Sequence, residues 1–182
     1  MIEVIKEPLP GLMVIKPKVY KDERGFFLET WQKEKYEKIG IEESFVQDNW
    51  SRSSQNVLRG LHFQKGNPQG KLVSVRSGSV FDVAVDLRNE SHTFGEWYGE
   101  ELNEDNRLQL YIPPGFAHGF LVLTETVDFE YKCTSYYNPK DEYGIFWSDP
   151  DLNINWKIKN PIVSDKDKEL PSFRELCETK II

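Results

Sequence analysis

Hydrophobic and polar residues alternate with a period of two along most of the chain, which is the pattern of β-strands that bury one face. The alternation is clearest in residues 80–88, VFDVAVDLR. A strand here sends successive side chains to opposite faces of a sheet. One face carries Phe81, Val83, Val85 and Leu87, and the other carries Asp82, Ala84, Asp86 and Arg88.

Extended character recurs on both sides of this segment. Residues 12–31 predict two strands joined by a turn at Asp22–Gly25, and residues 44–53 and 57–64 also read as strands. Residues 107–137 predict three strands, the first two separated by a Pro–Gly turn, and residues 145–147 predict a further short strand. Helical signals are confined to residues 32–41, where Gly40 ends the helix, and to the segment after Pro171.

Many short strands between Gly- and Pro-containing turns, with helix only at the margins, favour an antiparallel barrel or sandwich. The chain has 182 residues, enough for one such domain, and it shows neither an internal repeat nor a linker. We therefore expect an all-β fold in a single domain that spans residues 1–182. A barrel of this size holds one small ligand in its mouth.

Composition narrows the functional classes. The chain is 38% hydrophobic and 29% charged, and its formal net charge is −7, so we expect no nucleic-acid partner. An anionic ligand would need a local pocket of Arg and Lys. The two cysteines lack the spacing of a disulfide framework or a zinc site, which suits a reducing compartment. We expect a cytoplasmic protein, since the chain lacks a signal peptide and any apolar stretch long enough to span a membrane.

Three basic residues stand at strand positions in the strand–turn–strand pattern of residues 57–75, namely Arg59, His62 and Lys71. Lys71 shares its face with Val73 and Val75, so it points inward if they do. The alternative is a strand-end lysine that reaches solvent. Gly60 can mark a bulge that turns Arg59 and His62 toward one cavity. The alternative for His62 is a core histidine with its hydrogen bonds satisfied.

An acidic and a phenolic residue complete the candidate set. Tyr131 falls on the apolar face of its strand with Val127, Phe129 and Cys133, where an ordinary core tyrosine is the alternative. Asp167 belongs to the segment SDKD, residues 164–167. Such a segment is either a solvated turn or the source of a carboxylate that orients a histidine and stabilises its protonated form.

Histidine spacing argues against a metal site. The segment PPGFAHGF, with His118, is similar to the second motif of the cupin superfamily. Metal-binding cupins carry a His-x-His pair in the first motif, whereas the matching GLHFQ has Gln64 in place of the second histidine. His92 lies in a polar loop, where we expect it to be solvated. Too few ligands remain for a tetrahedral or facial-triad site, so we expect neither a metal nor another cofactor.

Seven segments, taken together and in this order, resemble the dTDP-4-dehydrorhamnose 3,5-epimerase family. They are DERGFFLETW, FVQDNWSRS, VLRGLHFQ, QGKLVSVRSGSVFDVAVDLR, YIPPGFAHGF, YKCTSYYNP and SDKD. The resemblance runs from about residue 10 to residue 175. It implies a cupin-type jelly roll, a homodimer and a metal-free isomerase that converts dTDP-4-dehydro-6-deoxy-D-glucose to dTDP-4-dehydro-L-rhamnose.

The resemblance also implies roles for single residues. His62 corresponds to the catalytic base, Asp167 to its partner, Tyr131 to the acid on the opposite face of the sugar, and Lys71 to a group near the C4 carbonyl oxygen. Arg59 and His118 would hold the sugar. The diphosphate and thymidine contacts would come from Arg24, Phe26, Glu29, Gln47, Asn49, Arg59 and Tyr137, with Glu142 and Lys166 as additions. Of these, Phe26 and Glu29 would come from a partner subunit.

The chemistry fits these residue types. A proton next to the C4 ketone is acidic because the carbanion delocalises onto oxygen, and inversion needs a base and an acid on opposite faces of the sugar. Three alternatives remain open: an epimerase that inverts only C3 or only C5, a non-catalytic cupin that binds a sugar nucleotide, and a metal-dependent cupin oxygenase. Gln64 argues against the last.

Overall fold

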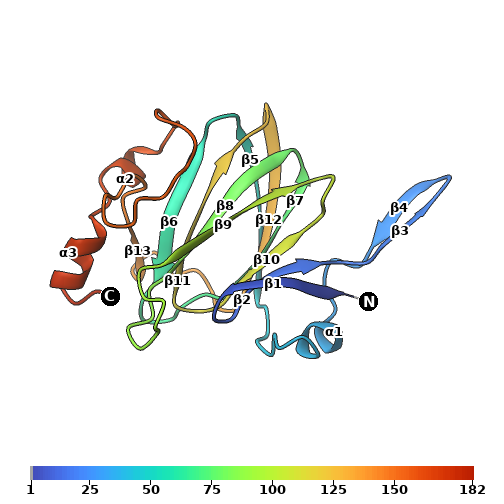
Figure 1. Ribbon diagram of the computed structural model, residues 1–182, viewed down its shortest axis with the longest axis horizontal. Coiled ribbons are helices and arrows are strands. Elements are labelled where there is room, and N and C mark those ends of the chain that lie inside the picture. Colours follow the sequence, from blue (N-terminus) through green and yellow to red (C-terminus); the bar gives the residue numbers. More distant parts are fainter. Residues whose placement is uncertain (1) are drawn as a thin grey trace.

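Most strands assemble into two antiparallel sheets that face each other in the computed structural model, which describes residues 2–182 (Figure 1). The first sheet consists, in order, of β1 (Glu3–Leu9), β2 (Leu12–Lys16), β10 (Gln109–Ile112), β7 (Lys71–Ser77), β12 (Thr126–Cys133) and β5 (Gln47–Ser54). The second consists of β13 (Glu142–Gly144), β6 (Leu58–Gln64), β11 (Phe116–Val122), β8 (Ser79–Asp86) and β9 (Trp97–Asn103).

A core of apolar side chains from both sheets fills the space between them. Val73 of β7, Phe129 of β12, Ala84 of β8 and Phe120 of β11 are all buried there. Burying apolar surface on the inner face of each sheet is what holds the two layers together. The expected all-β, cupin-type jelly roll with a few short helices is confirmed, and its hydrogen bonds divide most of the strands between these two sheets.

Strand β8 is buried on both faces. The predicted alternation is present: Asp82 and Ala84 turn toward the first sheet, while Val83 and Val85 pack under the C-terminal segment with Trp156. The more apolar face is thus the one covered by the chain's end, and the face that carries Asp82 lines the interior. Asp82 has no exposed surface.

Residues 12–31 form three strands, whereas two were expected. The expected turn at Asp22–Gly25 joins β3 (Val19–Asp22) to β4 (Gly25–Leu28), but β3 is separate from β2. Pro17 lies at the break, where it has no amide proton to donate to a ladder. The β3–β4 hairpin projects away from the two sheets (Figure 1).

Three short helices lie at the margins. They are α1 (Lys33–Glu37), α2 (Asp165–Lys168) and α3 (Phe173–Glu178), and α2 and α3 lie on the side opposite the hairpin (Figure 1). Within residues 2–182 no helix is long and apolar enough to cross a membrane. The short strand expected at residues 145–147 lies slightly earlier in the chain, as β13 (Glu142–Gly144). Beyond it, the Phe146 amide donates to the Pro171 carbonyl, outside the sheet.

Candidate active site

A cavity of about 420 Å³ lies between the sheets and is lined on one side by Ile162, Val163, Ser164, Lys166 and Asp167. Side chains from both sheets and from α2 line it, including His62, Lys71, His118, Tyr131 and Asp167. A second cavity of about 310 Å³ shares His62, Lys71 and Tyr131 with the first, so the two form adjoining compartments. The sequence candidates from five different segments therefore meet in one place.

His62 and Asp167 form a hydrogen-bonded pair. The Nε2 atom of His62 lies 2.6 Å from a carboxylate oxygen of Asp167, although 105 residues separate the two in sequence. The Asp167 side chain is 5% exposed and that of His62 is 29% exposed, so the imidazole faces the cavity while its partner stays covered. Burial by itself would raise the pKa of Asp167, but the hydrogen bond and charge of His62 hold it below its ordinary value.

Helix α2 positions this carboxylate. Ser164 caps the helix, since its Oγ accepts a hydrogen bond from the Asp167 amide. The second carboxylate oxygen of Asp167 accepts a hydrogen bond of 3.3 Å from the Gly60 amide. The segment SDKD is therefore a capped helical turn, and Asp167 is its buried residue.

The bulge expected at Gly60 is present in β6. The register between β6 and β11 shifts between the pairs His118–His62 and Phe120–Arg59. Gly60 has φ of +112°, and a Cβ atom there would lie 2.6 Å from the Gly119 Cα. Only glycine fits this close backbone approach. The bulge allows both Arg59 and His62 to line the cavity.

Lys71 and Tyr131 reach the cavity from the sheet opposite His62. Lys71 begins β7, whose Val73 and Val75 are buried in the core, and Tyr131 lies on β12 beside Phe129 with ring centroids 5.9 Å apart. Burial lowers the pKa of the Lys71 ammonium, against the opposing influence of Cys133, Asp82 and Glu142. Burial raises the pKa of the Tyr131 phenol. Tyr131 therefore carries its proton at neutral pH.

His118 has a carboxylate partner that sequence reasoning missed. Its Nε2 atom lies 2.9 Å and 3.1 Å from the two carboxylate oxygens of Asp82, which is fully buried on β8. Burial lowers the pKa of His118 and raises that of Asp82. A signal existed in the sequence: Asp82 shares its face with Ala84, and an acidic residue on a strand this apolar needs a partner.

The second compartment contains several expected binding residues. Gln47, Asn49, Tyr137 and Glu142 line it. Gln47 accepts a hydrogen bond of 2.9 Å from the Tyr137 amide and donates one of 3.0 Å to Asn49. Glu142 accepts a hydrogen bond from the Tyr137 hydroxyl and pairs with Lys166, which lines the first compartment. Arg59 donates to the Ser53 hydroxyl at 3.1 Å.

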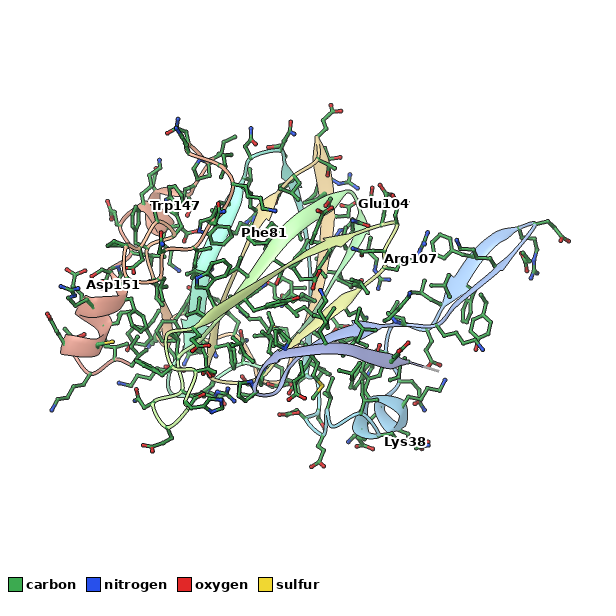
Figure 2. The ribbon with its side chains drawn as sticks, viewed as in Figure 1. Lys38, Phe81, Glu104, Arg107, Trp147 and Asp151 are labelled. Atoms are coloured by element: carbon green, nitrogen blue, oxygen red, sulfur yellow. The ribbon has the colours of Figure 1, made fainter. Side chains whose placement is uncertain are left out.

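Three expected binding residues lie away from the cavity within this chain. Arg24 is at the tip of the hairpin and pairs with Asp22, and Glu29 pairs with Lys35 at 2.7 Å. Phe26 packs under Arg107, whose guanidinium carbon lies 4.2 Å from the ring centroid. Figure 2 shows Arg107 between the sheets and the hairpin. A single chain therefore does not bring these three residues to the site.

Gln64 makes structural hydrogen bonds at the position where metal-binding cupins carry the second histidine of the motif. Its amide nitrogen donates to the Asn67 carbonyl at 2.9 Å, and its carbonyl accepts from the Asn138 amide at 2.8 Å. These bonds join the loop after β6 to the loop after β12. Among the described residues 2–182 no group of three His, Cys, Asp or Glu side chains is placed to hold a metal ion.

The arrangement is suited to proton transfer on two faces of one molecule. An imidazole backed by a carboxylate comes from the second sheet, and a protonated phenol comes from the first. The Lys71 amine lines the same cavity from the first sheet, and its burial lowers the pKa of this group. A planar, enolisable carbonyl compound between them would meet a base on one face and an acid on the other.

Comparisons with known proteins agree with this geometry. The family model for dTDP-4-dehydrorhamnose 3,5-epimerase matches residues 6–175. The dTDP-4-dehydrorhamnose 3,5-epimerase of Salmonella typhimurium is 51% identical over 183 residues, which cover 99% of this chain and 100% of that protein.

Solved structures share the fold of this chain. The epimerase from Legionella pneumophila in complex with dTDP-4-keto-L-rhamnose is 49% identical, with a TM-score of 0.92 over 96% of this chain and 94% of that one. ChmJ, a 3'-monoepimerase from Streptomyces bikiniensis in complex with dTDP-quinovose, is 29% identical, with a TM-score of 0.91 over 97% and 90% of the two chains. The family match and the identity to the Salmonella protein both span nearly the whole chain, and on them we conclude that the chain belongs to the dTDP-4-dehydrorhamnose 3,5-epimerase family.

Proposed function

We propose that the protein is an isomerase that inverts C3 and C5 of dTDP-4-dehydro-6-deoxy-D-glucose and yields dTDP-4-dehydro-L-rhamnose. The observation that carries this proposal is the pairing of His62 with Asp167 in a cavity that Tyr131 enters from the opposite sheet. Pure binding of a sugar nucleotide does not require an acid opposite a base.

His62 acts as the base that removes the proton from C3 and from C5. Neutral imidazole is suited to this task near neutral pH, and the Asp167 carboxylate stabilises the imidazolium that forms. The pKa of Asp167 lies below its ordinary value, so the carboxylate is ionised when the positive charge appears on His62.

Tyr131 returns a proton to the opposite face, which inverts each centre. Its pKa is raised by burial, so the phenol holds its proton until the enolate takes it. Lys71 lies near the C4 oxygen, where the enolate charge develops. Removing a donor of this kind costs about 3–4 kcal/mol of transition-state stabilisation in other enzymes.

The remaining expected residues bind the substrate. His118 and Arg59 hold the sugar in the first compartment. The second compartment accommodates the nucleotide through Gln47, Asn49 and Tyr137, and Lys166 and Glu142 lie between the compartments. Lys166 exchanges its partner Glu142 for a phosphate oxygen when the substrate enters.

A homodimer completes the site in this proposal. The β3–β4 hairpin carries Tyr20, Phe26 and Phe27, which are 53%, 56% and 68% exposed. Exposed aromatic side chains on a projecting arm are typical of an interaction surface. A second copy of this chain is the partner, and its hairpin brings Arg24 and Phe26 to the nucleotide, together with Glu29, which directly follows the hairpin.

We assign the whole chain, residues 1–182, to one domain in the cytoplasm. The single-domain assignment is supported by the C-terminal segment, whose Trp156 and Leu176 share a core cluster with Val83 of β8. The cytoplasmic assignment is supported by two free thiols, Cys133 and Cys177.

The reaction is tested with the 4-keto-6-deoxy sugar nucleotide in D₂O, with NMR of each carbon. The wild-type protein is expected to introduce deuterium at C3 and at C5, and His62→Ala to introduce it at neither. Tyr131→Phe is expected to slow product formation more than proton abstraction. His92→Ala changes an exposed loop histidine and serves as the control. Exchange at the wild-type rate in His62→Ala would remove His62 from the role of base.

An epimerase that inverts a single centre is the second candidate. It is favoured by the similarity of this chain to ChmJ, a 3'-monoepimerase. Such an enzyme would use the same pair with the sugar held differently. The same NMR experiment separates the two, because a single-centre enzyme gives a product inverted, and labelled, at only one carbon. A protein that binds the sugar nucleotide without introducing deuterium would be non-catalytic.

A further inference from the structure

Strand β5 presents a row of polar side chains to the interior. Gln47, Asn49, Ser51 and Ser53 are half-buried or buried, whereas the intervening residues are exposed. Three members of the row have partners: Gln47 bonds with Asn49, and Ser53 accepts from Arg59. Ser51 is the member between them, and it has no part in the proton transfers of His62 and Tyr131.

The hydroxyl of Ser51 lacks a partner. Its Oγ atom is buried and makes no hydrogen bond to any of residues 2–182. A buried hydroxyl without a hydrogen bond is costly, so each such group in a folded protein needs an explanation. If this part of the cavity wall served only for packing, an apolar side chain in place of Ser51 would cost less free energy. The unsatisfied hydroxyl therefore indicates a partner that arrives from outside the chain.

The position of Ser51 defines where that partner lies. Ser51 lines the first compartment together with His62, Lys71 and Tyr131. In the ladder between β5 and β12 it lies opposite Phe129, one inward position from the pair Asn49–Tyr131. Rotation about its single side-chain torsion moves the hydroxyl between staggered positions along this wall. The side chain is thus beside the proposed acid, at the reacting end of the cavity.

We infer that Ser51 is a substrate-binding residue whose hydroxyl forms a hydrogen bond with a sugar oxygen, on the face of the sugar where Tyr131 acts. This inference rests on the proposed function, which places the sugar in the first compartment. A serine hydroxyl both donates and accepts, so it suits a sugar hydroxyl group. The bond fixes the ring against the Tyr131 side of the cavity and so contributes to the alignment of C3 and C5 with His62.

The test compares two ligands and two variants by calorimetry. The ligands are dTDP-quinovose, which carries the 6-deoxy sugar, and dTDP, which lacks it. Ser51→Ala is expected to weaken binding of dTDP-quinovose about threefold to tenfold, the loss of one neutral hydrogen bond, and to leave dTDP binding unchanged. Ser54→Ala, on the exposed face of the same strand, is expected to change neither affinity.

Stability provides a second measurement. Because the Ser51 hydroxyl has no protein partner to lose, Ser51→Ala is expected to keep or raise the melting temperature. If Ser51→Ala bound dTDP-quinovose as tightly as wild type, the inference would be overturned. An equal loss of affinity for dTDP would also overturn it, because the hydroxyl would then contact the diphosphate and not the sugar. A fall in melting temperature would show a structural role instead. A wild-type protein that binds dTDP-quinovose yet introduces no deuterium into the 4-keto-6-deoxy sugar nucleotide would refute the epimerase reaction, while the Ser51 comparison would still decide the inference.

Discussion

Lys71 illustrates how a single residue can serve the reaction at a cost to the fold. Its strand continues inward through Val73 and Val75, so its ammonium is taken out of bulk water with them. Burial penalises the charged form, and the nearby Asp82 and Glu142 offset that penalty only in part. A residue that lowers stability in this way is retained where the chemistry needs its charge.

We therefore expect opposite effects of Lys71→Met on stability and activity. The variant removes a desolvated charge and keeps most of the side-chain volume, so its melting temperature should rise by a few degrees. The turnover rate should fall about 10²- to 10³-fold, because the enolate oxygen loses its cationic partner. Thermal denaturation and steady-state kinetics measure the two effects. A lower melting temperature would mean that Lys71 stabilises the fold.

The depressed pKa of Asp167 makes a prediction about acid stability. A carboxylate whose pKa is lower in the folded protein than in the unfolded chain stabilises the fold when the pH is above the unfolded pKa, which is about 4 for Asp. This contribution is lost as the pH falls through the folded pKa. Wild type should therefore exceed Asp167→Asn in stability at pH 7, and the difference should shrink as the pH falls below about 4. Urea unfolding at several pH values measures it, and a constant difference would contradict the assignment.

At the scale of secondary-structure elements, the bulge in β6 decides which side chains enter the cavity. Successive residues of a regular strand point to opposite faces, so a regular β6 would place Arg59 and His62 on different sides. The register shift at Gly60 turns both to the same side, and the shift depends on the close contact between Gly60 and Gly119. The amide of Gly60 also bonds to Asp167.

Gly60→Ala should consequently disturb both stability and catalysis. The added methyl group combines an unfavourable φ of +112° with contacts of 2.6 Å to backbone atoms, and a loss of about 2–4 kcal/mol is expected. Gly25→Ala is the matched control, because Gly25 has φ of +125° but no atom within 4 Å of a Cβ. Denaturant unfolding compares the two. Equal losses would mean that backbone strain alone, without the packing against Gly119, accounts for the effect.

At the scale of the whole molecule, the projecting hairpin separates expected binding residues from the rest of the site. Arg24 and Phe26 lie on an arm that extends beyond the sheets, whereas Gln47, Asn49 and Tyr137 line the second compartment. In the proposed dimer each arm completes the site of the other subunit. Closed two-fold symmetry then makes both sites equivalent.

Mixing two inactive variants tests this arrangement. His62→Ala keeps a complete arm but lacks the base, and Arg24→Ala/Phe26→Ala keeps the base but lacks the arm. After random exchange of subunits, half of the dimers are mixed and each contains one complete site, so on the order of one quarter of all sites should regain activity. Activity after mixing is measured against each variant alone. A mixture as inactive as its components would show that the arm serves its own chain.

The sequence by itself determined most of the strands, because a period of two follows directly from the geometry of an extended chain. It did not indicate β1 or β9, and it placed the short strand β13 a few residues too late. It also determined that Lys71 and Tyr131 share faces with buried residues, and it predicted the turn at Asp22–Gly25 and the bulge at Gly60. Local patterns suffice for these features, since each depends on residues only a few positions apart.

Only the tertiary structure decided which faces meet. The pairing of His62 with Asp167 joins residues 105 positions apart, and no periodicity carries that information. The pairing of His118 with Asp82 also depends on tertiary structure. Asp82 turns inward because the C-terminal segment covers the other face of β8. The unsatisfied hydroxyl of Ser51 likewise follows from the packing around it. Long-range contacts form from the burial of whole faces, so their partners emerge only when both sheets are in place.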